Sequence, residues 1–175
     1  MMKWHSFFAF DLIPAVQENN FWRNYLDCLL SDNAAPYSLH LAVFVEPFLQ
    51  YVLDGSKKIE SRFSSVRCAP YQSVRKDDVI LLKRAGGPVV GICRVANAWF
   101  YELEPGSLDA IKQQYADALC AQDPSFWEDR KKALFATLMR IQNVQAIQPL
   151  VIEKRDRRGW VVLQSASEQL KLPPG

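Results

Sequence analysis

The sequence predicts an α+β fold, a small mixed β-barrel with flanking helices, from three observations. The region from 39 to 164 contains five or so β-forming runs, and one short helix follows the first of them. The strands in the middle of the region are long, and a glycine interrupts one of them. Long, bent strands with a single short helix after the first favour a mixed barrel over a helical bundle.

The first half of this region is expected to form a strand, a helix and a second strand. LHLAVFV, from residue 39, is apolar and rich in β-formers, which is typical of a buried strand. Pro47 suits the first turn of a helix over EPFLQYVLD, and Gly55 suits the position just after its end. KKIESRF then alternates, which places Lys58, Glu60 and Arg62 on one face.

The second half is expected to add strands on both sides of a helical pair. RKDDVILLKR is typical of a strand entered through a charged turn, and PVVGICRVANAWF of a long strand bent at Gly91. The helical pair, 107 to 139, includes SFWEDRKKALFATLM, where Ser125 and Glu128 have capping-box spacing. The remaining residues to 164 predict two or three strands with a turn at 156 to 159.

The chain is predicted to hold one folded domain with extensions at both ends. Residues 1–36 are interpreted as an N-terminal helical extension, 39–164 as the domain and 165–175 as a C-terminal tail. Helical spacing from 20 to 31, capped by Asn19 or Asn20, supports the extension. The first 16 residues have no small-residue cleavage site after their apolar patch, so they are taken as mature protein.

Several classes of function are disfavoured by what the sequence lacks. No run of about 18 apolar residues exists, so no membrane span or membrane partner is expected. The four cysteines form no CxxC pair and only two histidines are present, so neither a metal site nor a cofactor is predicted. Isolated cysteines among apolar neighbours favour the cytoplasm. No phosphate-loop or dinucleotide-binding glycine motif follows a strand.

Charge is distributed in blocks along the chain. Residues 55–84 hold eight Lys or Arg against three Asp or Glu, and residues 131–175 hold the same numbers. Residues 101–130 hold two against seven. A basic region of this kind can bind a polyanion, although solvated faces that cancel in three dimensions would explain the pattern equally well.

The stretch GSKKIESR lies in the first basic block and carries a recognisable motif. Gly55, Lys57, Glu60 and Arg62 match every marked position of G-x-K-x-x-E-x-R, between the predicted helix and strand. With the strands that follow, residues 39 to 164 resemble the ASCH family of the PUA-like superfamily. The resemblance implies a PUA-like β-barrel with a cleft at the motif. It also implies RNA or a modified nucleotide as the partner.

The motif residues are the candidate ligand-binding residues. Lys57 suits a phosphate or a base oxygen, Arg62 suits planar contact with a phosphate or base edge, and Glu60 can accept from a base amino group. Lys83 and Arg84 end a strand and are predicted to line the same basic cleft. An exposed ion pair between Glu60 and Arg62, worth under about 1 kcal/mol, is the simpler alternative.

An enzyme is the alternative function: a small hydrolase, either an amidohydrolase or a ribonuclease, that acts on modified nucleosides or RNA. Its catalytic residues would be Lys57 and Glu60. Relatives that cleave acetylcytidine resemble G-x-K-x-x-T-x-R, with the threonine as nucleophile, whereas this chain has Glu60 at that position. We expect Glu60 to raise the pKa of Lys57, and Ser61 to point to the other face of the strand, so threonine-type hydrolysis is disfavoured.

Other residues have competing interpretations. Core packing is favoured over base stacking for Trp99, Phe100 and Tyr101, and a buried core role over catalysis for His40. One predicted turn holds four cations, Lys154, Arg155, Arg157 and Arg158. They could contact a phosphate backbone or simply be solvated, and both explanations remain open. A third function, a docking face for an acidic protein, also remains open for the basic block.

Overall fold

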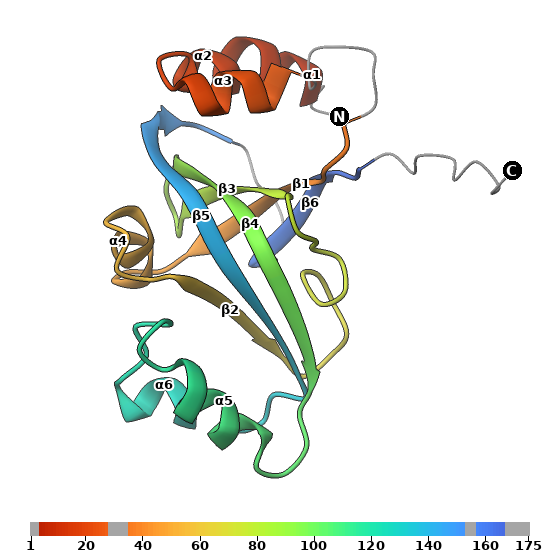
Figure 1. Ribbon diagram of the computed structural model, residues 1–175, viewed down its shortest axis with the longest axis vertical. Helices are drawn as coiled ribbons and strands as arrows, with labels where there is room; N and C mark the ends of the chain where they lie inside the picture. The colour runs from red at the N-terminus through yellow and green to blue at the C-terminus, as the bar shows by residue number, and fades with distance from the viewer. Residues whose placement is uncertain (1–3, 28–34, 153–156, 167–175) are drawn as a thin grey trace, which may run out of the picture.

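A computed structural model describes residues 4–27, 35–152 and 157–166. A six-stranded sheet forms the body of this structure (Figure 1). Its strands are β1 (Leu39–Phe44), β2 (Ile59–Ser64), β3 (Val79–Arg84), β4 (Val89–Glu102), β5 (Phe135–Leu150) and β6 (Trp160–Gln164). Their order is β2-β5-β4-β3-β1-β6, with β1 and β3 parallel and every other pair antiparallel. The predicted α+β mixed barrel is confirmed, as a curled half-barrel.

The half-barrel leaves its two edge strands, β2 and β6, unpaired with each other. The curl nevertheless brings β2 close to the opposite edge, because Arg62 Nη1 donates hydrogen bonds to the carbonyls of Val43 and Gly159, beside β6. We call this line of approach, between β2 on one side and the β1–β6 edge on the other, the open seam. An unpaired edge strand presents backbone N–H and C=O groups that have no partner within the sheet.

The N-terminal helices cover one face of the sheet (Figure 1). They are α1 (Trp4–Phe7), a π-helical turn η1 (Phe8–Leu12), α2 (Ile13–Val16) and α3 (Asn20–Leu26). The side chain of Asn19 caps α3 by accepting from the backbone N–H of Trp22. Phe8, Leu12, Trp22 and Leu26 pack on alternate residues of β1 and β3, which include Leu39, Leu41, Val79 and Leu81. The division between extension and domain remains a prediction.

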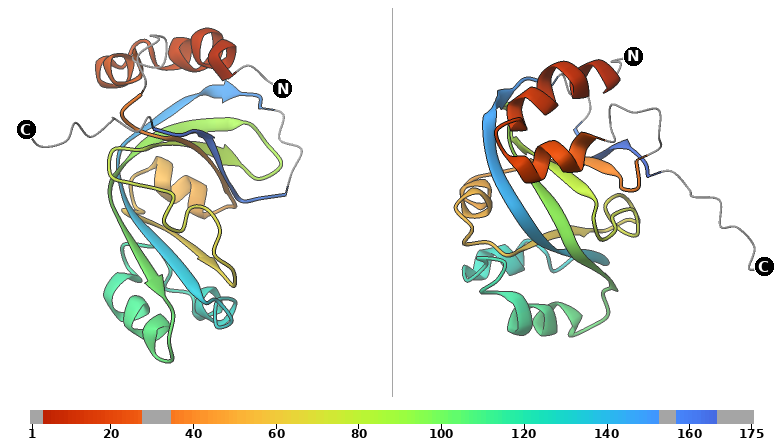
Figure 2. Two further views of the ribbon diagram at one scale, coloured as in Figure 1. Left: turned by 90° about the vertical axis from the view of Figure 1, so that its right-hand side faces the viewer. Right: turned by 45° about the horizontal axis from the view of Figure 1, so that its top comes forward.

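The opposite, concave face holds the short helix α4 (Phe48–Leu53), which lies within the curve of the sheet (Figure 2). Leu49 and Val52 pack there against the other alternate set of β1 and β3 residues, Ala42, Ile80 and Leu82. After Asp54 the chain turns at Gly55, whose φ of 80° lies in the left-handed region. Glycine adopts that conformation without strain, as the sequence predicted for this position.

Two further helices, α5 (Ser107–Tyr115) and α6 (Pro124–Glu128), pack at the far ends of β2, β4 and β5. The second helix of the predicted pair 107 to 139 begins near its predicted start, but its predicted length is wrong, because α6 ends at Glu128 and β5 begins at Phe135. The predicted capping box is replaced by Asp123, whose side chain accepts from the N–H of Ser125. No helix within the described ranges has the length and apolar character needed to cross a membrane.

Candidate ligand-binding cleft

Lys57 enters the cleft from the turn that joins α4 to β2. Its backbone N–H donates to the carbonyl of Tyr51 at 2.8 Å, which fixes the turn. Its side chain is only 2% exposed, and its ammonium donates to the carbonyl of Leu119 at 2.8 Å and lies 5.2 Å from the ring centre of Phe48. Strand alternation would place the side chains of Lys57 and Glu60 on different faces of the strand. Because Lys57 precedes the strand, its side chain nevertheless reaches the same cavity.

Glu60 lies between two cations and is almost completely buried, with its side chain 6% exposed. Its Oε2 is 3.6 Å from Lys57 Nζ, and its Oε1 is 2.8 Å from Arg62 Nε. Burial lowers the pKa of Lys57, and the attraction of Glu60 opposes this only in part. Glu60 therefore raises the pKa of Lys57 as expected, but the net pKa lies below its ordinary value, because removing the ammonium from water outweighs its pairing with the carboxylate.

Arg62 bridges the open seam. Its Nη1 donates to the carbonyls of Val43 at 3.0 Å and Gly159 at 3.3 Å, and its guanidinium lies against two rings, 4.8 Å from that of Phe44 and 5.3 Å from that of Trp160. The 2.8 Å approach of Nε to Glu60 is a contact between opposite charges without the alignment of a hydrogen bond. Nη2 is buried and has no hydrogen-bond partner among the described residues.

These three side chains border one cavity of about 420 Å³. Phenylalanine rings from α4, α6 and the strands enclose it, and Asp129 and Arg130 add two charged groups from the residues after α6. Ser61 also borders the cavity, although alternation predicted its side chain on the other face. The full set of lining residues is Val43, Phe44, Val45, Phe48, Lys57, Glu60, Ser61, Arg62, Phe63, Phe126, Asp129 and Arg130.

Arg130 is the cleft residue that the sequence did not reveal. Its guanidinium lies 3.5 Å from the ring centre of Phe126, and its Nη1 donates to the carbonyl of Phe126 at 2.6 Å. Burial lowers the pKa of Arg130. The sequence places it in an acidic stretch that was assigned to a helix outside the barrel. Only its position after a tryptophan and a phenylalanine, in SFWEDR, could have drawn attention to it.

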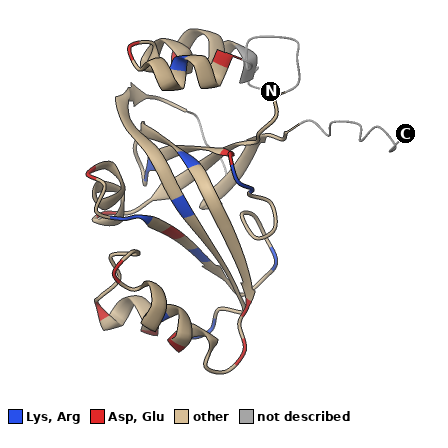
Figure 3. Cartoon of the chain, viewed as in Figure 1, with Lys and Arg blue, Asp and Glu red and all other residues tan. Residues whose placement is uncertain are grey.

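The other predicted cations lie outside this cavity. Lys83 donates to the carbonyl of Gly87 in the turn before β4, and Arg84 forms an exposed ion pair with Glu46. Arg157 and Arg158 are exposed, while Lys154 and Arg155 fall outside the described residues. Figure 3 shows the resulting pattern, with a carboxylate between cations on β2 and several acidic residues on and around α5 and α6. The structure thus groups Lys57, Glu60 and Arg62 but does not add Lys83 and Arg84 to them.

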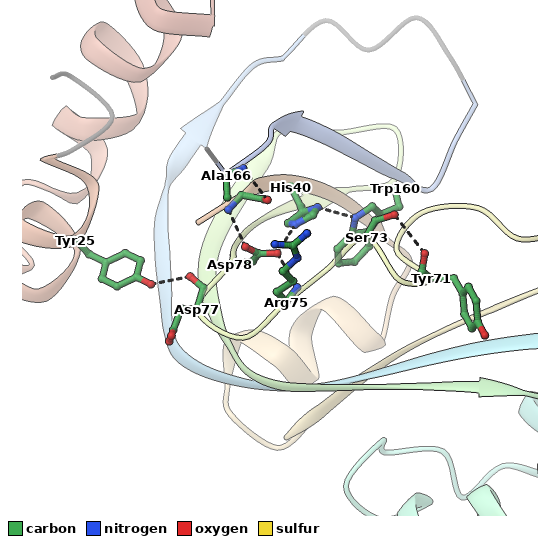
Figure 4. Close-up of polar contacts among 10 residues, drawn as sticks. Tyr25, His40, Tyr71, Ser73, Arg75, Asp77, Asp78, Trp160 and Ala166 are labelled. Atoms are coloured by element: carbon green, nitrogen blue, oxygen red, sulfur yellow. Dashed lines mark hydrogen bonds and ion pairs between the residues drawn. The ribbon is translucent and has the colours of Figure 1, made fainter. Parts of the chain in front are cut away.

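A second buried polar cluster, drawn in Figure 4, lies behind Arg62 of the cleft, whose guanidinium is 5.3 Å from the ring centre of Trp160. His40 is fully buried on β1, and its Nε2 lies 2.9 Å from Asp78 Oδ2. Trp160 Nε1 donates to His40 Nδ1 at 3.1 Å. Since an indole nitrogen only donates, Nδ1 must accept, and the proton on His40 lies on Nε2. The expected core role of His40 therefore includes holding the ring against which Arg62 rests.

Nothing in the described part of the chain gathers three His, Cys, Asp or Glu side chains into a possible metal site. What the cleft offers is hydrogen-bonding capacity. A carboxylate has about four acceptor positions and a lysine three donors, so Glu60 and Lys57 retain capacity beyond their mutual contacts. With Arg62 Nη2 also free, a planar polar molecule enclosed by phenylalanine rings could satisfy donors and acceptors together.

The half-barrel with a cleft at its open seam has an ASCH-like fold. The ASCH protein of Zymomonas mobilis is similar to it with a TM-score of 0.58 and 13% identity, over 73% of this chain and 88% of that one. Two variants of the same bacterial protein give the same TM-score, at 11% and 13% identity, with 74% and 73% of this chain covered and 90% and 91% of the other. No family model and no curated protein matches the sequence.

Proposed function

We propose that the cleft binds RNA or a modified nucleotide, with one base inside the cavity beside Lys57, Glu60 and Arg62. The observation that carries this proposal is the unused hydrogen-bonding capacity of the buried Lys57 and Glu60 and the half-buried Arg62 around one cavity of about 420 Å³. That volume lies within the range of small-molecule sites, roughly 300–1,000 Å³. Nearby phenylalanine rings can pack on the ring of a base, and Glu60 can accept from its amino group.

The test is binding of a panel of nucleosides, mononucleotides and short single-stranded RNAs, measured by thermal shift and calorimetry. A ligand of the folded protein raises its apparent stability. We expect Lys57→Met to lose binding and the matched control Lys58→Met to keep it, because Lys58 is exposed and outside the cavity. Equal affinity in the two variants, or no binding by any member of the panel, would overturn the proposal.

Salt dependence separates the two forms of ligand. RNA that contacts several cations through its phosphates loses affinity steeply as salt rises, because bound counterions are released. Recognition of one uncharged nucleoside in the cavity shows a nearly flat response. Binding should therefore be measured at two or more salt concentrations for both a nucleoside and an RNA.

The lowered pKa of Lys57 favours a second candidate function, hydrolysis of an acylated nucleoside. A neutral lysine can act as a general base. Lys57 would take a proton from water, the hydroxide oxygen would attack the amide carbonyl, and the C–N bond would break as the departing amine takes that proton back. Glu60 is the alternative group to activate the water.

The enzyme proposal is tested by incubating acylated cytidine with wild type, Lys57→Ala, Glu60→Thr and Lys58→Met. Turnover by wild type and Lys58→Met that vanishes in Lys57→Ala would support it. Turnover confined to Glu60→Thr would show that the threonine chemistry is absent from the natural chain. No turnover by wild type would leave the binding function alone.

A further inference from the structure

The cleft does not end at Arg62. A second pocket of about 190 Å³ lies beyond this residue and shares Arg62 and Phe63 with the first. β2, the loop that follows it, β5 and the start of β6 form its walls. The residues beyond the shared pair are Ser64, Cys68, Ala69, Pro70, Tyr71, Phe135, Thr137, Gly159 and Trp160. Two pockets therefore adjoin each other at the open seam, with one guanidinium between them.

The second pocket is aromatic and carries an unused polar group. Tyr71 is 8% exposed, and its ring meets that of Phe135 edge-on with centroids 5.0 Å apart. No hydrogen bond joins the Tyr71 hydroxyl to any described residue, although the residue lines the pocket. Trp160 forms another wall, held in place by its hydrogen bond to His40. Such a pocket suits one flat ring with a polar edge.

The residue between the pockets is also incompletely bonded. Nη1 of Arg62 uses its hydrogen bonds on two carbonyls, whereas the buried Nη2 has no partner among the described residues. A buried donor without a partner costs free energy, so such groups call for an explanation. A phosphate oxygen beside Arg62 would supply the missing acceptor with a charge-assisted hydrogen bond.

We propose that the second pocket is a subsite for the nucleotide next to the one in the main cavity. The seam then takes a dinucleotide step of single-stranded RNA: one base beside Lys57 and Glu60, the linking phosphate at Arg62 Nη2, and the neighbouring base against Tyr71 and Trp160. This subsite rests on the proposed function, since it presupposes a base in the first cavity.

The experiment compares the sixteen RNA dinucleoside monophosphates with the same compounds without the base that we propose for the second pocket. In those compounds a hydrogen on the ribose replaces that base. Both members of a pair carry the same phosphodiester, so their difference in affinity measures the second ring alone. We expect about tenfold tighter binding for the complete dinucleotide, as is typical of one stacked base. Tyr71→Phe should reduce that gain severalfold, and the matched control Tyr51→Phe, at a residue that lines neither pocket, should not.

Cys68 provides an independent readout, because this exposed thiol borders the second pocket. The dinucleotide should slow its reaction with a thiol reagent, and the abasic compound should not, with Cys68→Ser correcting for other cysteines. Equal affinity of both compounds without protection of Cys68 would overturn the subsite and leave the proposed function standing. Failure of every compound to bind would overturn both.

Discussion

The two buried polar clusters of this protein differ in how completely they are satisfied. In the cluster behind the cleft, Asp78 accepts from the backbone N–H groups of Ser38 and Arg75, each at 2.7 Å, and from His40. Both nitrogens of His40 are also used. In the cleft, Arg62 Nη2 is unpartnered among the described residues. The three donors of Lys57 and the roughly four acceptor positions of Glu60 also exceed the contacts that these two residues make.

This difference is the one we expect between a structural cluster and the binding cluster that we propose. A network whose members all have partners inside the protein fixes the position of β1, β3 and β6 and leaves nothing for a ligand. A network with open positions at a cavity gives up some stability in exchange for recognition. Substitutions in the structural cluster should therefore mainly reduce stability, whereas substitutions in the cleft should mainly reduce binding.

The largest effect is expected for Asp78→Ala. It leaves three donors without partners, the two backbone N–H groups and the N–H of His40. Each unsatisfied buried donor costs about 1–3 kcal/mol, so the free energy of unfolding should fall by about 3 kcal/mol or more. Urea unfolding measures it, with Asp109→Ala on the exposed surface of α5 as the control, expected within about 0.5 kcal/mol of wild type. Equal stability of the two variants would refute the structural role.

Replacing the whole cleft cluster should not lower the free energy of unfolding as Asp78→Ala does. The variant Lys57→Met, Glu60→Leu, Arg62→Met removes the buried charges together rather than leaving one unpaired. Such replacements leave stability unchanged or raise it by about 1–4 kcal/mol, because charges no longer have to be taken out of water. Ligand binding should be abolished. A loss of stability comparable to that of Asp78→Ala would show that the cleft cluster is structural after all.

A smaller effect is expected in the pH dependence of stability. Burial lowers the pKa of Lys57 below its ordinary value of 10.5, so between the lowered pKa and 10.5 the unfolded chain holds a proton that the folded protein has lost. The free energy of unfolding should therefore rise with pH across that window, by at most about 1.4 kcal/mol per pH unit. Urea unfolding from pH 7 to 10.5 should give a flatter profile for Lys57→Met. Parallel profiles would contradict this.

The smallest effect is expected for Arg84→Gln. The ion pair of Arg84 with Glu46 is exposed, and such pairs contribute under about 1 kcal/mol. Nucleotide affinity should also remain as in wild type, whereas Arg62→Gln should reduce it. Similar losses of affinity in the two variants would place Arg84 in the cleft, as the sequence predicted.

The sequence predicted the parts of the site that are local in the chain. Gly55 and the alternation of β2 set the positions of Glu60 and Arg62 within a few residues of each other, and β1, β3 and β4 were recognisable from their composition. Trp160 and Arg130 could not be found in this way, because they reach the cleft from segments that the fold alone brings near β2. Burial of Lys57 depends on the carbonyl of Leu119 and is equally invisible in the sequence.

The wrong helix at 125 to 139 has a specific physical cause. KKALFATLM has helical spacing, but residues 135 to 139 pair with β2 on one side and β4 on the other. Ala136, Leu138 and Met139 are then buried in the middle of the sheet. Pairing on both edges outweighs local propensity, and it depends on strands that lie far away in the sequence.

The bridge from Arg62 to Gly159 has a consequence for synthesis of the protein. These residues are 97 positions apart, and the second belongs to the segment that leads into β6, the last strand described. At roughly 5–20 residues per second, a ribosome takes about 5 to 20 s to make the intervening chain. A nascent chain that already displays the whole motif therefore lacks the opposite wall of its cleft. Both walls of the proposed binding cleft are present only once translation has delivered β6.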